Sequence, residues 1–145
     1  MQNFLGIYQY SIDAKNRLAV PAKFRQSLGK ENGLVLAQGL EGCLNLYTAQ
    51  SWQKLNERLE TVPLKNKMDQ RAFKRMLFAS ACEIEFDEEG RVLIPQNLVE
   101  YANLTGDAVI IGMGEKIEIW AKALWEKYQK TQKKSFEKHA STLEI

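Results

Sequence analysis

Two aspartates, Asp13 and Asp87, occupy matching places in two copies of one short motif, and they have the clearest potential for chemistry. Each copy reads as an apolar residue, Asp, three turn residues, Arg, three apolar residues and Pro, over residues 12–21 and 86–95. The second copy follows at an offset of 74 residues. Two symmetry-related carboxylates in a duplicated β-fold are the arrangement of an aspartic protease, whose two Asp residues share a proton.

The residues that follow each Asp argue against such an acid pair. An aspartic protease places Thr-Gly or Ser-Gly directly after the catalytic Asp, whereas Ala14 and Glu88 follow here. The sequence also shows no Ser/His/Asp or Cys/His arrangement and no phosphate-binding loop. We therefore interpret each Asp as a partner of the Arg four residues later, or of N–H groups in its own turn, and we expect that the chain is not an enzyme.

Basic residues gather in the first copy of the motif and in the segment after it. A basic cluster at one end of a β-barrel suits contact with phosphate groups, but an ordinary solvated surface is an equal alternative on charge alone. In the second copy Glu88 and Glu89 stand beside Arg91. If both copies contact nucleic acid, the first should contribute more. The cluster comprises Lys15, Arg17, Lys23 and Arg25.

Other kinds of site find little support in the sequence. The two cysteines, Cys43 and Cys82, lie at apolar positions of predicted strands and are interpreted as reduced core thiols. The only histidine is His139, and no metal-ligand spacing is present. Without a signal-peptide pattern or an apolar run of about 18 residues, we expect a cytoplasmic protein that uses no cofactor, metal, membrane or small-molecule substrate.

The elements that position the motif are a strand, a tight turn and a second strand. Asn16 and Gly90 stand at the same position of the two turns, and both residue types tolerate a positive φ. Pro21 and Pro95 then end the second strand, because Pro has no N–H group to donate.

The duplication extends well beyond the motif. Residues 34–39 match 108–112, residues 43–47 match 116–120, and Trp52 matches Trp125, the last two at an offset of 73. The tryptophans, including Trp120, are interpreted as core or oligomer contacts. The chain has 145 residues, of which 45% are hydrophobic and 26% charged, with a formal net charge of +2. Length and composition predict one globular domain, and the duplication of strands and helices predicts that it is an α+β body with pseudo-two-fold symmetry.

The predicted organisation is a first repeat with its helix, a helical connector, and a second repeat with a C-terminal helix. These parts are assigned to residues 1–62, 63–80 and 81–145. Strands are expected over 4–12, 17–20, 34–38, 43–47, 82–86, 91–94, 107–112 and 116–120. Helices are expected over 22–28, 48–62, 64–80, 96–103 and 121–139.

With both motifs in view, nearly the whole chain resembles the MraZ family of bacterial transcriptional regulators. Asn16 is one departure, because the family commonly has Gly there; Asn also tolerates the left-handed conformation. The segments that carry the resemblance are Phe4-Leu5-Gly6-Ile7-Tyr8, residues 13–18, 21–25, 75–81 and 87–91, Ile94-Pro95 and Ile119-Trp120.

The resemblance implies a fold and a partner. Each half would be an AbrB-like motif, and the two would intertwine as a swapped-hairpin β-barrel with flanking helices. Members of the family assemble into large closed rings, an octamer or larger, and bind direct repeats in the promoter of their own division and cell-wall gene cluster. Such a protein is expected in the cytoplasm, associated with the nucleoid.

The resemblance also implies which residues contact DNA. Lys15, Arg17 and Arg91 would reach phosphates or guanine edges, with Lys23 and Arg25 on the same surface. The turns would be organised by Asp13, Asp87, Asn16 and Gly90. The alternative is a ring-forming scaffold or protein-interaction module with only non-specific affinity for DNA.

Overall fold

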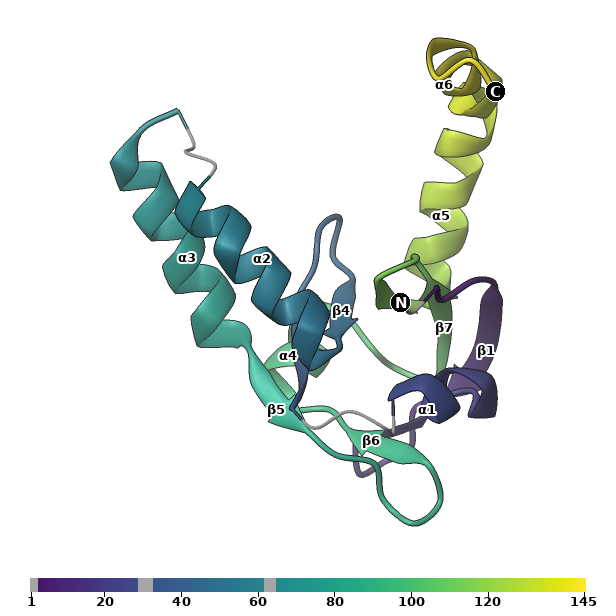
Figure 1. Cartoon of the computed structure of the whole chain (residues 1–145). Coiled ribbons are helices and arrows are strands. Elements are labelled where there is room, and N and C mark those ends of the chain that lie inside the picture. The colour runs from purple at the N-terminus through teal and green to yellow at the C-terminus, as the bar shows by residue number, and fades with distance from the viewer. Residues whose placement is uncertain (1–2, 29–32, 62–64) are drawn as a thin grey trace.

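The computed structural model describes residues 3–28, 33–61 and 65–145 and confirms a mixed α+β fold (Figure 1). The strands are β1 (Ile7–Ser11), β2 (Arg17–Ala19), β3 (Leu34–Gln38), β4 (Leu44–Tyr47), β5 (Cys82–Ile84), β6 (Arg91–Leu93), β7 (Asp107–Gly112) and β8 (Lys116–Ala121). The helices are α1 (Ala22–Leu28), α2 (Ala49–Thr61), α3 (Lys67–Ser80), α4 (Gln96–Tyr101), α5 (Lys122–Gln132) and α6 (Phe136–Thr142), with a 3₁₀ turn, η1 (Lys133–Ser135), between the last two.

Six of the strands form one antiparallel sheet whose order reflects the duplication. The order is β1-β7-β8-β4-β3-β5. Replacing each strand by its equivalent in the other copy (β1 by β5, β3 by β7, β4 by β8) gives the same order read backwards. Each copy therefore contributes its first strand to the edge of the other copy's hairpin, and the two hairpins meet where β4 pairs with β8.

The closed barrel that the resemblance implied is not confirmed. The edge strands β1 and β5 pair on one side only, and β2 pairs with β6 in a separate two-stranded ribbon. The ribbon strands have three residues each, and Pro21 and Pro95 stand two residues after their ends. Because Pro donates no hydrogen bond, the ladder of the ribbon does not continue into the sheet.

The main core lies between the inner face of the sheet and the ribbon with α1 and α4. It is built from equivalent residues of the two copies, such as Leu18 with Val92 and Leu36 with Ile110, all fully buried. Further equivalent pairs are Val20 and Ile94, Phe24 and Leu98, Leu34 and Ala108, Leu44 and Ile117, and Leu46 and Ile119. The alternation of inward and outward residues along each strand produces this shared core.

Helices cover the outer face of the sheet. Trp52 of α2 packs on Val35 and Tyr47, and α3 adds Leu77 to the same cluster. In the second copy, Trp125 of α5 packs on Trp120. The α2–α3 pair and the α5–α6 segment project as two arms from the β-body, away from the end that carries β6 (Figure 1). The tryptophans thus pack in apolar clusters, as expected.

Several element boundaries differ from the sequence expectation, and two of these differences have clear local reasons. The first strand begins only at Ile7, because Gly6 has a φ of +94° and leaves Phe4 in an isolated bridge to Gly114. The C-terminal helix is broken by η1. No apolar side chain occurs between Tyr128 and Phe136, so no packing holds this stretch in one straight helix.

Some expectations remain open. The division into 1–62, 63–80 and 81–145 stays a prediction, and residues 62–64, where the first boundary falls, lie outside the described residues. No helix in the described part of the chain has the length and apolar character to cross a membrane.

The shared core predicts that the ribbon stabilises both copies together. Leu18→Ala removes a fully buried side chain and should lower the free energy of unfolding by about 2–5 kcal/mol. Leu93→Ala, on the same ribbon but 62% exposed, is the matched control and should change it by no more than about 0.5 kcal/mol. Urea denaturation measures both values. Equal losses in the two variants would contradict this account of the ribbon.

Candidate functional site

The turn of the first copy is organised by the carboxylate of Asp13. Its Oδ1 accepts hydrogen bonds from the backbone N–H of Lys15 at 2.9 Å and of Arg17 at 2.8 Å. Its Oδ2 accepts from Nε of Arg17 at 2.7 Å. The tight reversal places Asn16 at a φ of +62°, a conformation that Asn and Gly adopt at low cost. One carboxylate thus holds both the turn and the guanidinium.

The turn of the second copy repeats this geometry. Oδ1 of Asp87 accepts from the backbone N–H groups of Glu89 and Arg91, each at 2.9 Å. Oδ2 of Asp87 accepts from Nε of Arg91 at 2.9 Å. Gly90, the equivalent of Asn16, has a φ of +77°. Each turn therefore has one Asp that accepts three hydrogen bonds and one residue, Asn16 or Gly90, with a positive φ.

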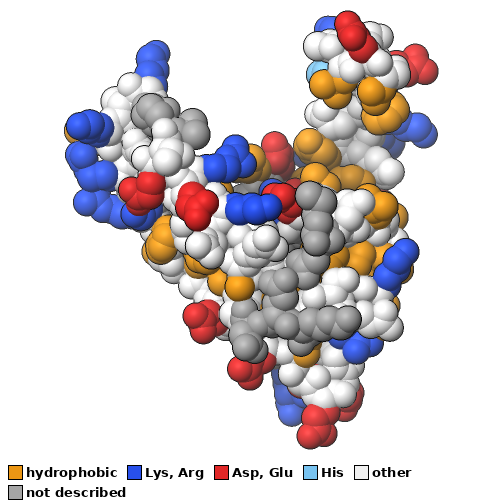
Figure 2. All heavy atoms as spheres, in the orientation of Figure 1, with side chains coloured by type: hydrophobic (Ala, Val, Ile, Leu, Met, Phe, Trp, Pro, Cys, Tyr) orange, Lys and Arg blue, Asp and Glu red, His pale blue; other side chains and the backbone are white. Residues whose placement is uncertain are grey.

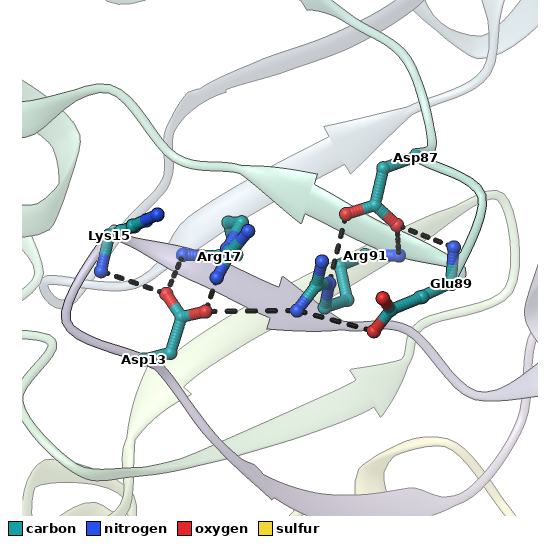
Figure 3. Close-up of polar contacts among 6 residues, drawn as sticks. All are labelled: Asp13, Lys15, Arg17, Asp87, Glu89 and Arg91. Carbon is teal, nitrogen blue, oxygen red and sulfur yellow. Dashed lines mark hydrogen bonds and ion pairs between the residues drawn. The ribbon is translucent and has the colours of Figure 1, made fainter.

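The β2–β6 ribbon brings the two turns together. Arg17 lies opposite Leu93 and Ala19 lies opposite Arg91, so the two arginines stand near opposite ends of the pairing. Figure 3 shows the guanidinium of Arg91 between its own Asp87 and Asp13 of the other turn, whose Oδ2 lies 3.9 Å from Nη1 of Arg91. Backbone bonds also cross: the N–H of Ile94 donates to the carbonyl of Asn16 at 2.8 Å.

Electrostatics keep both carboxylates charged. Hydrogen bonds from the backbone N–H and side chain of Arg17 lower the pKa of Asp13, and those from Arg91 lower the pKa of Asp87 in the same way. The hydrogen bond to Asp87 and nearby carboxylates raise the pKa of Arg91. The side chains of Arg17 and Arg91 are still 33% and 24% exposed, so each is oriented by its Asp and accessible to a partner.

The other predicted contact residues lie on the first copy. Lys15 is exposed at the turn and Lys23 is exposed on α1. Arg25 is half-buried: its Nε donates to the carbonyl of Val20 at 2.9 Å, and its guanidinium lies against Gly90 of the second turn. A Cβ at position 90 would come within 2.6 Å of Arg25 Cζ, so Gly90 also makes room for this side chain.

The structure thus gathers Lys15, Arg17, Arg25 and Arg91 around the ribbon, while no contact among the described residues ties Lys23 to it. In the view of Figure 2, the end of the molecule away from the arms carries basic and acidic side chains next to each other. The surface is therefore mixed in charge rather than a uniformly basic patch.

One residue of the site, Gln96, was missed from the sequence, whereas Glu89 was already placed beside Arg91. Oε2 of Glu89 lies 3.4 Å from Nη1 of Arg91, and the side-chain amide of Asn16 donates to Oε1 of Gln96 at 2.9 Å. The sequence signal for Gln96 is its place directly after the Pro that ends the second motif.

Burial disfavours the thiolate form of both cysteines. Cys43 is free and buried, and burial raises its pKa to about 12; burial also raises the pKa of Cys82. Within the described ranges, no three His, Cys, Asp or Glu side chains gather as metal ligands would.

Comparisons with known proteins agree with the duplicated pattern. A family model described as "MraZ protein, putative antitoxin-like" matches the chain twice, over residues 3–76 and 77–144. The Transcriptional regulator MraZ of Clostridium beijerinckii is 48% identical over 128 residues, 88% of each chain. Its namesakes in Clostridium tetani and Caldanaerobacter subterraneus are 47% identical over 125 residues (86% of each chain) and 44% identical over 140 residues (97% of this chain and 96% of the relative).

The lowered pKa values predict how the turns respond to acid. A lowered folded-state pKa stabilises the fold above the ordinary value of 3.8, and this stabilisation is lost as the pH falls through the folded-state pKa. The double variant Asp13→Asn/Asp87→Asn should therefore be less stable than the parent at neutral pH. The difference should shrink below about pH 4.

Chemical denaturation at a series of pH values measures this difference. Glu88→Gln is the control, because it removes an exposed carboxylate from the same turn. The side chain of Glu88 forms no hydrogen bond or ion pair with the described residues. It should leave the free energy of unfolding nearly unchanged at every pH. A gap between parent and double variant that stays constant down to pH 2 would disprove the role of the two carboxylates.

Proposed function

The chain belongs to the MraZ family, and we propose that it is a transcriptional regulator that binds specific double-stranded DNA through the β2–β6 ribbon. The named relatives are transcriptional regulators rather than enzymes, which agrees with the expectation that this chain is not an enzyme. The target is expected to be direct repeats in the promoter of its own division and cell-wall gene cluster, and the protein is expected on the nucleoid.

The observation that carries this proposal is the fixed orientation of the two arginines. Asp13 engages Nε of Arg17, so both terminal guanidinium nitrogens of Arg17 remain as donors toward a partner. Asp87 likewise engages Nε of Arg91, whose Nη1 also lies within ion-pair distance of Glu89 and Asp13. Two parallel donors of this kind match O6 and N7 of guanine, or two oxygens of a phosphate. Because the turn and its Asp already hold the side chain, less conformational entropy is lost on binding.

Multiple copies would supply the affinity that one ribbon lacks. Each ribbon strand has only three residues, so a single copy offers a small contact surface. In a ring of an octamer or larger, neighbouring copies would engage successive repeats, and each bound copy would raise the effective concentration of the next. The spacing of the repeats would then matter as much as their sequence.

Exposed apolar residues on the arms favour the second candidate, a ring-forming scaffold or interaction module with only non-specific DNA affinity. Met68 and Met76 of α3 and Phe136 of α6 are all more than 60% exposed. Figure 2 shows hydrophobic side chains along the α5–α6 arm. The salt dependence of binding separates the candidates. Phosphate contacts make log K fall linearly with log salt, whereas apolar contacts between proteins do not.

Binding to promoter DNA is the first test. We expect the protein to prefer a duplex from upstream of its own gene, with intact repeats, over duplexes with scrambled repeats or altered spacing. The preference should persist at two salt concentrations, measured by fluorescence anisotropy. Equal weak binding to all three duplexes that disappears at the higher salt would instead favour the scaffold.

A single-residue test addresses the ribbon itself. Arg17→Ala should weaken binding to the intact repeats by about 1–3 kcal/mol per site, roughly 5- to 150-fold. Lys127→Ala on α5 removes one exposed charge from an arm and is the matched control. It should bind within about twofold of the parent. Circular dichroism confirms folding of both variants, and unchanged affinity of a folded Arg17→Ala protein would rule out this role of Arg17.

A further inference from the structure

Arg25 of α1 belongs to the first copy, yet its side chain lies against the turn of the second copy. Its Nε donates to the carbonyl of Val20 at 2.9 Å, and its guanidinium covers Gly90, where a Cβ would come within 2.6 Å of Cζ. The N–H of Val20 in turn donates to the carbonyl of Gly90 at 3.2 Å. Val20 therefore binds both the Arg25 side chain and the backbone of the second turn.

The base of this contact is fixed in the core. Phe24 and Leu28 anchor α1 on either side of Arg25, and both are buried, as is Val20. Gly90 is buried too, although it belongs to a turn whose other central residues are exposed. The second turn thus rests on an anchored helix through one side chain.

The first turn is held in a different way. At the offset of 74 residues, Arg25 corresponds to the buried Val99, and Gly90 corresponds to Asn16. Val99 has no polar group, and the side-chain amide of Asn16 donates instead to Gln96. Arg25 and Gly90 therefore differ together from their counterparts. This is expected of two residues that fit each other, because any Cβ at position 90 would collide with the guanidinium.

The contact acts on the backbone that orients Arg91. The N–H of Gly90 donates to the carbonyl of Asp87 at 3.0 Å, and the next N–H, that of Arg91, donates to Oδ1 of Asp87 at 2.9 Å. The bond from Nε of Arg91 to Asp87 depends on this same turn. A displacement of Gly90 would therefore change the direction in which Arg91 points.

We propose that Arg25 is a positioning residue of the ribbon, which holds the second turn so that Asp87 can orient Arg91 toward DNA. This inference rests on the proposed function. The resemblance placed Arg25 itself on the DNA-contacting surface. Its Nε and one face of its guanidinium are instead engaged within the protein, so it acts on binding through Arg91 and not through a contact of its own.

Hydrogen exchange measured by mass spectrometry tests whether Arg25 holds the turn. Arg25→Val introduces the residue found at the equivalent position of the second copy. The N–H groups of residues 87–91 should then exchange roughly 2- to 10-fold faster, as expected for the loss of one hydrogen bond. Those of residues 13–17 should change less. Lys23→Val, an exposed position on the same helix, is the matched control and should leave both segments unchanged.

A double-mutant cycle tests whether Arg25 acts through Arg91. In the parent, Arg25→Val should weaken binding to the intact repeats at least about fivefold, whereas in an Arg91→Ala background it should weaken binding less than about twofold. The second effect is small because no side chain is left to orient. Lys23→Val should weaken binding by the same factor in both backgrounds, since any phosphate contact of Lys23 is independent of the second turn.

Each outcome decides one claim. Equal weakening by Arg25→Val in both backgrounds would mean that Arg25 contacts DNA itself, and would overturn the proposal. Exchange that accelerates equally along the whole chain would also overturn it, since Arg25 would then support the fold in general. A parent without preference for the intact repeats would overturn the proposed function and the role of Arg25 in binding. Faster exchange confined to residues 87–91 would still show in that case that Arg25 holds the turn.

Discussion

The pairing of β2 with β6 is the contact on which the rest of the molecule depends. Three residues from each copy form it, and the middle pair, Leu18 and Val92, is fully buried in the core that both copies share. The same pairing sets the distance between the two Asp–Arg turns and brings Asp13 within reach of Arg91. Packing and the candidate site therefore come from one short antiparallel ladder.

Local features of the chain could be predicted from sequence, because local rules decide them. The turn residues predicted the reversals at Asn16 and Gly90, and the limits of α1 and β7 agree with the expectation. The strand order could not be predicted, because alternation along a strand tells which residues face the core but not which strand lies beside it. The expected barrel is not confirmed for the same reason, since its closure depends on partners and not on pattern.

In the candidate site, too, local contacts could be predicted from the sequence and contacts between the copies could not. The bond from each Arg to the Asp four residues before it follows from spacing and was predicted. The contacts of Arg91 with Asp13 and of Arg25 with the second turn cross between the copies, so they depend on tertiary structure. Duplication preserved the backbone of the two turns, whereas the side chains at the equivalent positions 15 and 89 differ in charge. The two turns thus share a backbone geometry but differ in surface charge.

The exchange of first strands between the copies has a consequence for synthesis on the ribosome. The partner of β1 is β7, about 100 residues later in the chain, where Ser11 lies opposite Asp107. At roughly 5–20 residues per second, β1 emerges on the order of 5–20 s before β7 is made. During this interval the nascent first half exposes the apolar faces that β7, β8 and β6 later cover. Chaperones would meet this half before the second half arrives to complete it.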